Sequence, residues 1–140
     1  MKTNPFVKVW TSILSYLCFG MSSARSTEYD ERPKAKIAIN DLNCQALFDT
    51  GSQATLLNWQ TFLKLKRRPS LERINVSLNA ANGSGLTVLG KTDLRFDIGG
   101  HECVRPTIIV KGLAIECIIG HDTITAEAIV IDAKGKKLIF

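Results

Sequence analysis

The residues with the clearest chemical potential in this 140-residue chain are Asp49, Thr50, Gly51 and Ser52, which follow a short apolar segment. A carboxylate at the end of a strand can point into a cleft while the backbone turns away. Gly51 permits a sharp turn or a close approach that a side chain would prevent, and we expect the Thr50 hydroxyl to lock the loop through a hydrogen bond. The tripeptide alone is weak evidence, because average residue usage produces it by chance in about 1 in 30 chains of this length.

A second group with chemical potential contains two histidines and two of the four cysteines, namely His101, Cys103, Cys117 and His121. Two cysteines and two histidines can bind zinc, but their spacing here is not a usual zinc pattern. The cysteines are better explained as small buried apolar residues, and the histidines as surface or packing residues. The sequence therefore predicts no metal site and no cofactor.

The segments that would position Asp49 have the alternating pattern of strands. Ile37 and Ile39 alternate with other residues before a turn at 40–43, and the next strand ends directly before Asp49. The same pattern continues along the chain. We expect strands over 35–40, 44–48, 55–57, 74–78, 86–89, 92–98, 102–104, 107–110, 115–119, 129–131 and 138–140.

Helices are expected to be few and short. Asn58 can cap a helix that runs to about Lys66, and a helical turn near the C-terminus fits Asp122 to Ala128, with Asp122 as a candidate cap. Many short strands at regular spacing predict a small all-β barrel or sandwich.

Composition limits the classes of protein that this chain can represent. Hydrophobic residues make up 45% and charged residues 22%, which suits one globular domain and excludes a disordered tail. No apolar run reaches the roughly 18 residues that would predict a membrane span. The net charge of +5 comes partly from two basic clusters, at 64–68 and 134–137, without interleaved aromatic residues. We interpret them as solvated surface and expect no nucleic-acid partner.

The N-terminal part differs from the rest. Residues 1–24 combine two lysines, an apolar stretch and small residues near Ala24, so two interpretations stay open: a secretory signal peptide or an apolar leader. A signal peptide would place the protein in the secretory pathway, whereas an apolar leader would leave it in the cytoplasm. Residues 25–34 are a charged linker ended by Pro33, and 35–140 form the predicted folded domain.

Three blocks of sequence together resemble a known family, the single-domain aspartic proteases of retroviruses and long-terminal-repeat retrotransposons, called retropepsins. The resemblance is strongest to the gypsy-type retrotransposon members. The blocks are Ala46–Ser52 with Ala54–Leu57, then Ala80–Gly83, then Cys117–Asp122 with Ile129–Asp132. Their order and spacing agree with the family across almost the whole of residues 36–140.

The resemblance implies a small closed β-barrel of the acid-protease type with one short helix near the C-terminus. It implies that Asp49 is catalytic within the loop formed by Thr50, Gly51 and Ser52. Residues Ala81, Asn82 and Gly83 would form a flap over an extended peptide, and Gly120 and Asp122 would be structural residues near the site.

The mechanism that the resemblance implies needs two carboxylates that share one proton, because two like charges so close cannot both ionise easily. Asp49 is the only aspartate of this chain followed by Thr-Gly. One chain therefore supplies half of the pair, and we expect a symmetric homodimer. The implied function is hydrolysis of a retroelement polyprotein. A catalytically silent dimerising or peptide-binding module, and a cellular protease of the same fold, remain as alternatives.

Overall fold

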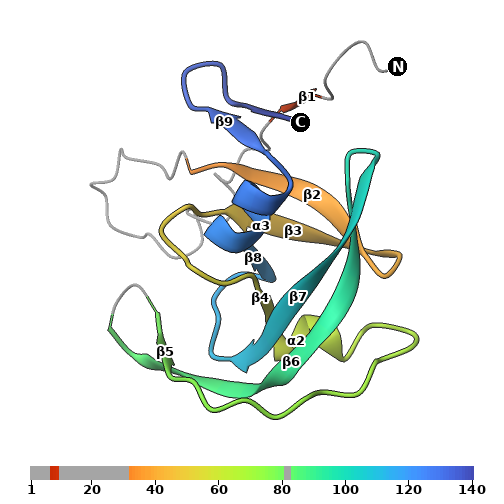
Figure 1. Ribbon diagram of the computed structural model, residues 1–140, viewed down its shortest axis with the longest axis vertical. Coiled ribbons are helices and arrows are strands. Elements are labelled where there is room, and N and C mark those ends of the chain that lie inside the picture. Colours follow the sequence, from red (N-terminus) through yellow and green to blue (C-terminus); the bar gives the residue numbers. More distant parts are fainter. Residues whose placement is uncertain (1–6, 10–31, 81–82) are drawn as a thin grey trace, which may run out of the picture.

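The computed structural model of the protein describes residues 7–9, 32–80 and 83–140 (Figure 1). Most of the predicted leader and linker, and the flap residues Ala81 and Asn82, lie outside the described residues. No helix among the described residues is both long and apolar enough to cross a membrane.

Six strands form a closed ring, which confirms the predicted all-β barrel. A pairing between the second and sixth strands closes it, at Ala38 with Asp97 and Ile39 with Phe96. In order around the ring, the strands are β2 (Lys34–Ile39), β3 (Leu42–Phe48), β8 (Cys117–Ile119), β4 (Leu56–Asn58), β7 (His101–Lys111) and β6 (Gly85–Ile98). The short β5 (Leu78–Asn79) pairs with the start of β6.

Two hairpins supply four of the six barrel strands. The β2–β3 hairpin turns at Asn40 and Asp41, whose φ angles of 47° and 70° suit these residue types. The β6–β7 hairpin turns at Gly99 and Gly100, which also have positive φ. β6 and β7 are each continuous, whereas the sequence predicted two strands in place of each. In β6 the sequence pattern breaks between the predicted strands 86–89 and 92–98. A bulge between Val88 and Gly90 accommodates this break, and the strand continues through it.

The parallel pairing of β3 with β8 is what positions the candidate site. Ala46 pairs with Cys117 and Phe48 with Ile119, so the two strands end side by side. β4 pairs with β8 on its other side. The segments that follow β3 and β8 therefore leave the barrel next to each other.

Two expectations about local structure were wrong. The helix α2 (Trp59–Phe62) has its predicted cap, since the Asn58 side chain accepts a hydrogen bond from the Gln60 amide, but it ends before Lys66. Exposed basic side chains follow it, and like charges at helical spacing oppose continuation. Residues 74–77 are not a strand; on either side of them, the chain pairs with β6 at the isolated bridge of Glu72 with Lys91 and through β5.

The barrel interior forms the hydrophobic core. Its buried side chains come from all six barrel strands and include Phe48, Phe96, Ile39, Leu57, Leu94, Ile109 and Ile119. The predicted C-terminal hairpin is confirmed as β9 (Val130–Asp132) and β10 (Lys137–Ile139), and β1 (Val7–Val9) pairs with β10. This terminal sheet lies at the end of the molecule opposite β5, beyond the short helix α3 (His121–Ala126) (Figure 1).

Candidate active site

Asp49 lies directly after β3 and is half-buried. Its backbone and side chain make the hydrogen bonds that shape the loop. Its amide donates a hydrogen bond to the Ile119 carbonyl at 2.9 Å, which continues the β3–β8 contact. Its carboxylate oxygen Oδ1 accepts from the Gly51 amide at 2.8 Å, and its carbonyl accepts from the Ser52 amide at 3.1 Å. Among the described residues only Oδ1 is engaged in this way, which leaves Oδ2 for a water or a substrate.

The hydroxyl predicted to lock this loop does not do so. Thr50 is exposed, and its hydroxyl has no hydrogen-bond partner within the part of the chain that the structure describes. Ser52 takes that role instead, because its Oγ donates to the Ala54 carbonyl at 2.8 Å. The loop is thus held by Asp49 and Ser52 rather than by Thr50.

Gly120 is required where the loop approaches the end of β8. A Cβ atom on this residue would lie 2.8 Å from the Ser52 carbonyl oxygen, and it would also overlap the Ala54 carbonyl. The next amide, of His121, donates to the same Ser52 oxygen at 2.7 Å. Only a residue without a side chain permits this approach.

A buried hydroxyl connects the loop to α3. Thr55 is fully buried; its Oγ1 donates to Asp122 Oδ1 at 2.7 Å and accepts from the Gly120 amide at 3.1 Å. It also lies 2.7 Å from Thr123 Oγ1, which accepts from Arg105 Nε at 3.2 Å. Asp122 does not cap α3 as the sequence suggested, because Gly120 occupies the N-cap position. Its carboxylate anchors Thr55 instead.

Asp49 opens onto two clefts. The larger, of about 590 Å³, lies between the Asp49 loop and the base of the predicted flap at Asn79, Ala80 and Ser84. The other, of about 530 Å³, extends towards Ile131. Among the described residues lining either cleft, Asp49 is the only carboxylate, while Arg32 contributes positive charge to both.

The base of the predicted flap is a tight turn that carries Gly83. The Ala80 amide donates to the Ser84 carbonyl at 2.8 Å, and the Gly83 amide donates to the Ala80 carbonyl at 2.9 Å. Gly83 is exposed, with a φ of 89°. The other two predicted flap residues, Ala81 and Asn82, lie outside the described residues.

The four residues considered as zinc ligands are not brought together. Cys117 is fully buried in the barrel core, and His121 contacts Thr125. His101 and Cys103 do lie close together, with Glu127 as a third neighbour. Sequence reasoning missed Glu127 and also Arg105, because both are brought into place only by the packing of β7 against α3.

Comparisons with known proteins agree with this fold. The sequence model of a family described as aspartyl protease matches residues 35–123. The EIAV protease, solved in complex with the inhibitor HBY-793, superposes with a TM-score of 0.60 at 18% identity, covering 76% of this chain and 94% of that one. The retroviral protease-like domain of Ddi1 from Leishmania major gives a TM-score of 0.62 at 18% identity, covering 76% and 85%. None of the curated proteins compared with the chain matches it.

Proposed function

The chain belongs to the aspartyl protease family, and we propose that it is an aspartic endopeptidase whose catalytic pair consists of Asp49 from each of two identical chains. The observation that carries this proposal is the placement of Asp49. It ends a barrel strand, keeps one carboxylate oxygen available, and faces a cleft bounded by the flap base.

The need for a second chain follows from the chemistry. Water-mediated peptide hydrolysis without a metal uses one carboxylate as base and one carboxylic acid as proton donor. The clefts at Asp49 offer a single carboxylate among the described residues. A symmetric homodimer supplies the second from the same position of the partner, and the two groups then titrate as a pair.

In the proposed reaction, the ionised Asp49 takes a proton from water, and the water oxygen bonds to the peptide carbonyl carbon. The protonated Asp49 of the other chain donates a hydrogen bond to the developing oxyanion. The carbon–nitrogen bond then breaks as the nitrogen receives the proton that the first Asp49 took from water, and the carbonyl of the new carboxylic acid re-forms. The hydrogen bonds of Asp49 and Ser52 hold the loop that contains Thr50 and Gly51, while Ala81, Asn82 and Gly83 close over an extended peptide and exclude water.

The first experiment compares the full chain with its Asp49→Asn variant. Each is incubated at high concentration with a diverse peptide pool, from mildly acidic to neutral pH, and new termini are identified by mass spectrometry. We expect cleavage by the parent and none by Asp49→Asn. The exposed residue Asp93, on β6, supplies the matched control Asp93→Asn, which should cleave like the parent. Equal cleavage by Asp49→Asn and the parent would contradict the proposal.

A mixing experiment tests the shared pair directly. Parent and Asp49→Asn chains are unfolded together in equal amounts, refolded, and assayed at constant total concentration. If both copies of Asp49 are needed, random pairing leaves about one quarter of the activity. If each chain acts alone, half remains, and the dimeric pair is wrong.

The biological substrate has two candidate classes. The likeness to the EIAV enzyme supports processing of a retroelement polyprotein. The likeness to the Ddi1 domain has a similar TM-score and supports a cellular protease as the second candidate. The preference found in the peptide pool separates them when it is compared with junctions of retroelement polyproteins. A folded dimer that cleaves nothing would instead be the silent peptide-binding module.

A further inference from the structure

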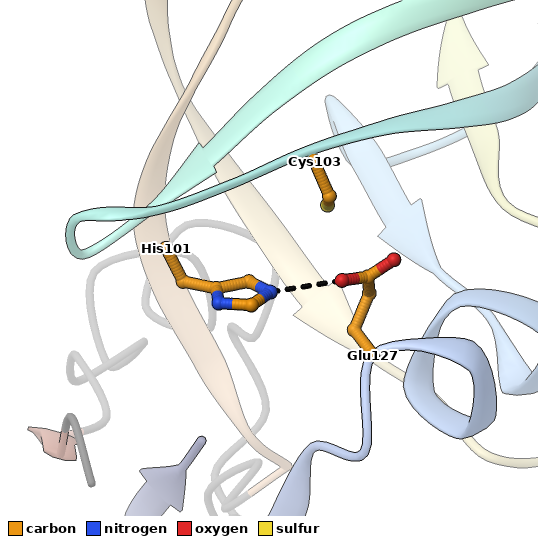
Figure 2. A group of neighbouring side chains, drawn as sticks. All are labelled: His101, Cys103 and Glu127. Carbon is orange, nitrogen blue, oxygen red and sulfur yellow. Dashed lines mark hydrogen bonds and ion pairs between the residues drawn. The ribbon is translucent and has the colours of Figure 1, made fainter. Parts of the chain in front are cut away.

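A second cluster of reactive side chains lies where β7 begins, away from both clefts that contain Asp49. It consists of His101, Cys103 and Glu127, none of which lines either cleft. Figure 2 shows that His101 and Cys103 project from the same strand while Glu127 approaches from the end of α3. His101 and Cys103 are two residues apart on β7, so their side chains share one face of the strand.

The three groups converge closely enough to share one ion. One ligand atom of each, an imidazole nitrogen, a sulfur and a carboxylate oxygen, lies within 4.8 Å of the other two. His101 Nε2 and Glu127 Oε1 are already 2.8 Å apart. Tetrahedral zinc with ordinary bond lengths separates its ligand atoms by about 3.3 to 3.7 Å. The observed separations, from 2.8 Å for His101 Nε2 and Glu127 Oε1 up to a limit of 4.8 Å, bracket that spacing, so binding requires the side chains to adjust.

We propose that His101, Cys103 and Glu127 form a zinc(II) site with an open fourth position. Nitrogen, sulfur and carboxylate oxygen are the three donor types that zinc accepts together. Three protein ligands leave a fourth tetrahedral position for water or another ligand. The expectation of no metal, drawn from the sequence, is revised by this proposal, which does not depend on the proposed protease activity.

The surroundings of the cluster favour a defined ligand geometry. All three residues are partly buried, so solvent competes less for their donor atoms than on an open surface. The His101 ring stacks on the Phe140 ring, with 5.3 Å between centroids and 8° between planes, which fixes the orientation of the imidazole. The Arg105 guanidinium is hydrogen-bonded to two neutral acceptors, Thr123 Oγ1 and the Asp122 carbonyl, so it keeps a positive charge that a metal ion must overcome.

A metal here would connect three parts of the molecule. It would join the start of β7 to the end of α3, and through the His101–Phe140 stack it would restrain the C-terminal residue. An ion that binds only the folded state stabilises that state by mass action. Zinc is therefore expected to raise the melting temperature of the full chain.

The test uses the full chain, freed of metal and kept reduced, with zinc and cobalt(II) as probes. Zinc is titrated in competition with a chromophoric chelator, and we expect one zinc per chain. Cobalt(II) is added separately, and we expect a thiolate-to-cobalt charge-transfer band with tetrahedral d–d bands. Cys103→Ser, His101→Asn and Glu127→Gln should each weaken zinc binding by at least about 10-fold, and Cys103→Ser should abolish the charge-transfer band.

Matched controls keep the result specific. His121→Asn replaces the other histidine, Glu102→Gln replaces an exposed neighbour on β7, and Asp49→Asn removes the candidate catalytic carboxylate. All three should bind zinc like the parent. Melting curves without metal establish that each variant is folded. Absence of binding to the folded parent, or binding that survives in folded Cys103→Ser, would overturn the proposal.

Discussion

At the scale of single residues, Gly120 allows the candidate catalytic loop to approach the end of β8 closely. Its missing side chain leaves room for the carbonyl groups of Ser52 and Ala54. The same approach allows the His121 amide to reach the Ser52 oxygen. The position of Asp49 therefore depends on a residue that carries no reactive group.

Gly120→Ala should destabilise the fold and displace the loop. Its Cβ would meet backbone atoms, which cannot rotate away, so we expect a loss of about 1–3 kcal/mol in the free energy of unfolding. Gly85→Ala is the matched control, because a Cβ there would lie 3.9 Å from its nearest neighbour, the Asn79 side-chain oxygen. Urea unfolding measures both, and equal losses would contradict this account.

Cys44 makes the stability of the protein sensitive to alkaline pH. Burial, and then the charge of Glu116, raise the pKa of the Cys44 thiol from 9.0 to about 12, although Lys64 acts in the opposite direction. The unfolded chain therefore loses this proton first as the pH rises. The contribution to stability is complete below pH 9 and is lost as the pH rises from 9 towards 12.

The free energy of unfolding should fall by up to about 1.4 kcal/mol per pH unit for this one thiol above pH 9. Cys44→Ala removes the titrating group, so its stability should decline less steeply over the same interval, whatever its stability at neutral pH. Urea unfolding at a series of pH values gives both slopes. Parallel slopes for parent and variant would show that the thiol is not the cause.

At the scale of elements, α3 is attached to the barrel by the hydroxyl of Thr55. This group donates to Asp122 and accepts from the Gly120 amide at the start of the helix, so one buried oxygen orients the helix relative to β4 and β8. The contact also determines the direction in which the chain leaves β8, beside Asp49.

Thr55→Val keeps the shape of the side chain and removes these hydrogen bonds. The Asp122 carboxylate and the Gly120 amide would each lose a buried partner, and we expect a cost of about 2–3 kcal/mol. Thr107→Val is the control, because Thr107 is also fully buried but its hydroxyl donates only to the Arg105 carbonyl. Calorimetric melting should show the larger loss for Thr55→Val. A larger loss for Thr107→Val would contradict this role.

The sequence predicted these elements where the pattern was local. Alternation and turn residues located the β2–β3 and β9–β10 hairpins, and Asn58 located the start of α2. Patterns that depend on distant partners failed. Residues 74–77 alternate like a strand but lack a continuous neighbour, and the interruptions in β6 and β7 are absorbed by their pairing with each other.

The sequence predicted the kind of candidate site, an aspartate loop, but only some of the residues that support it. The residues of the Asp49 loop are contiguous, so the sequence contained them together. The roles of Ser52 in place of Thr50, and of Thr55 as the support of α3, depend on contacts across the barrel. Glu127 reaches His101 only because α3 packs near β7. The spacing of His101 and Glu127 in the sequence does not indicate that their side chains are in contact.

At the scale of the whole molecule, Asp49 is the one carboxylate among the described residues that line the clefts, so the proposed activity requires two chains. We expect specific activity to fall on dilution, because the fraction of chains in dimers falls with concentration. Activity measured over a wide range of protein concentrations, alongside sedimentation of the same samples, tests this. Constant specific activity in samples that sediment as monomers would be incompatible with a shared pair.

The closure of the barrel has a consequence for how the chain acquires its structure during synthesis. The β2–β3 hairpin leaves the ribosome early, but β3 pairs next with β8, and β2 closes the ring with β6, both of which are made much later. Until then the apolar face of the hairpin, including Ile39 and Phe48, has no cover. Contacts so distant in sequence form slowly. A chain that has been synthesised only as far as β3 therefore exposes apolar strand surface, which favours association with other unfolded chains.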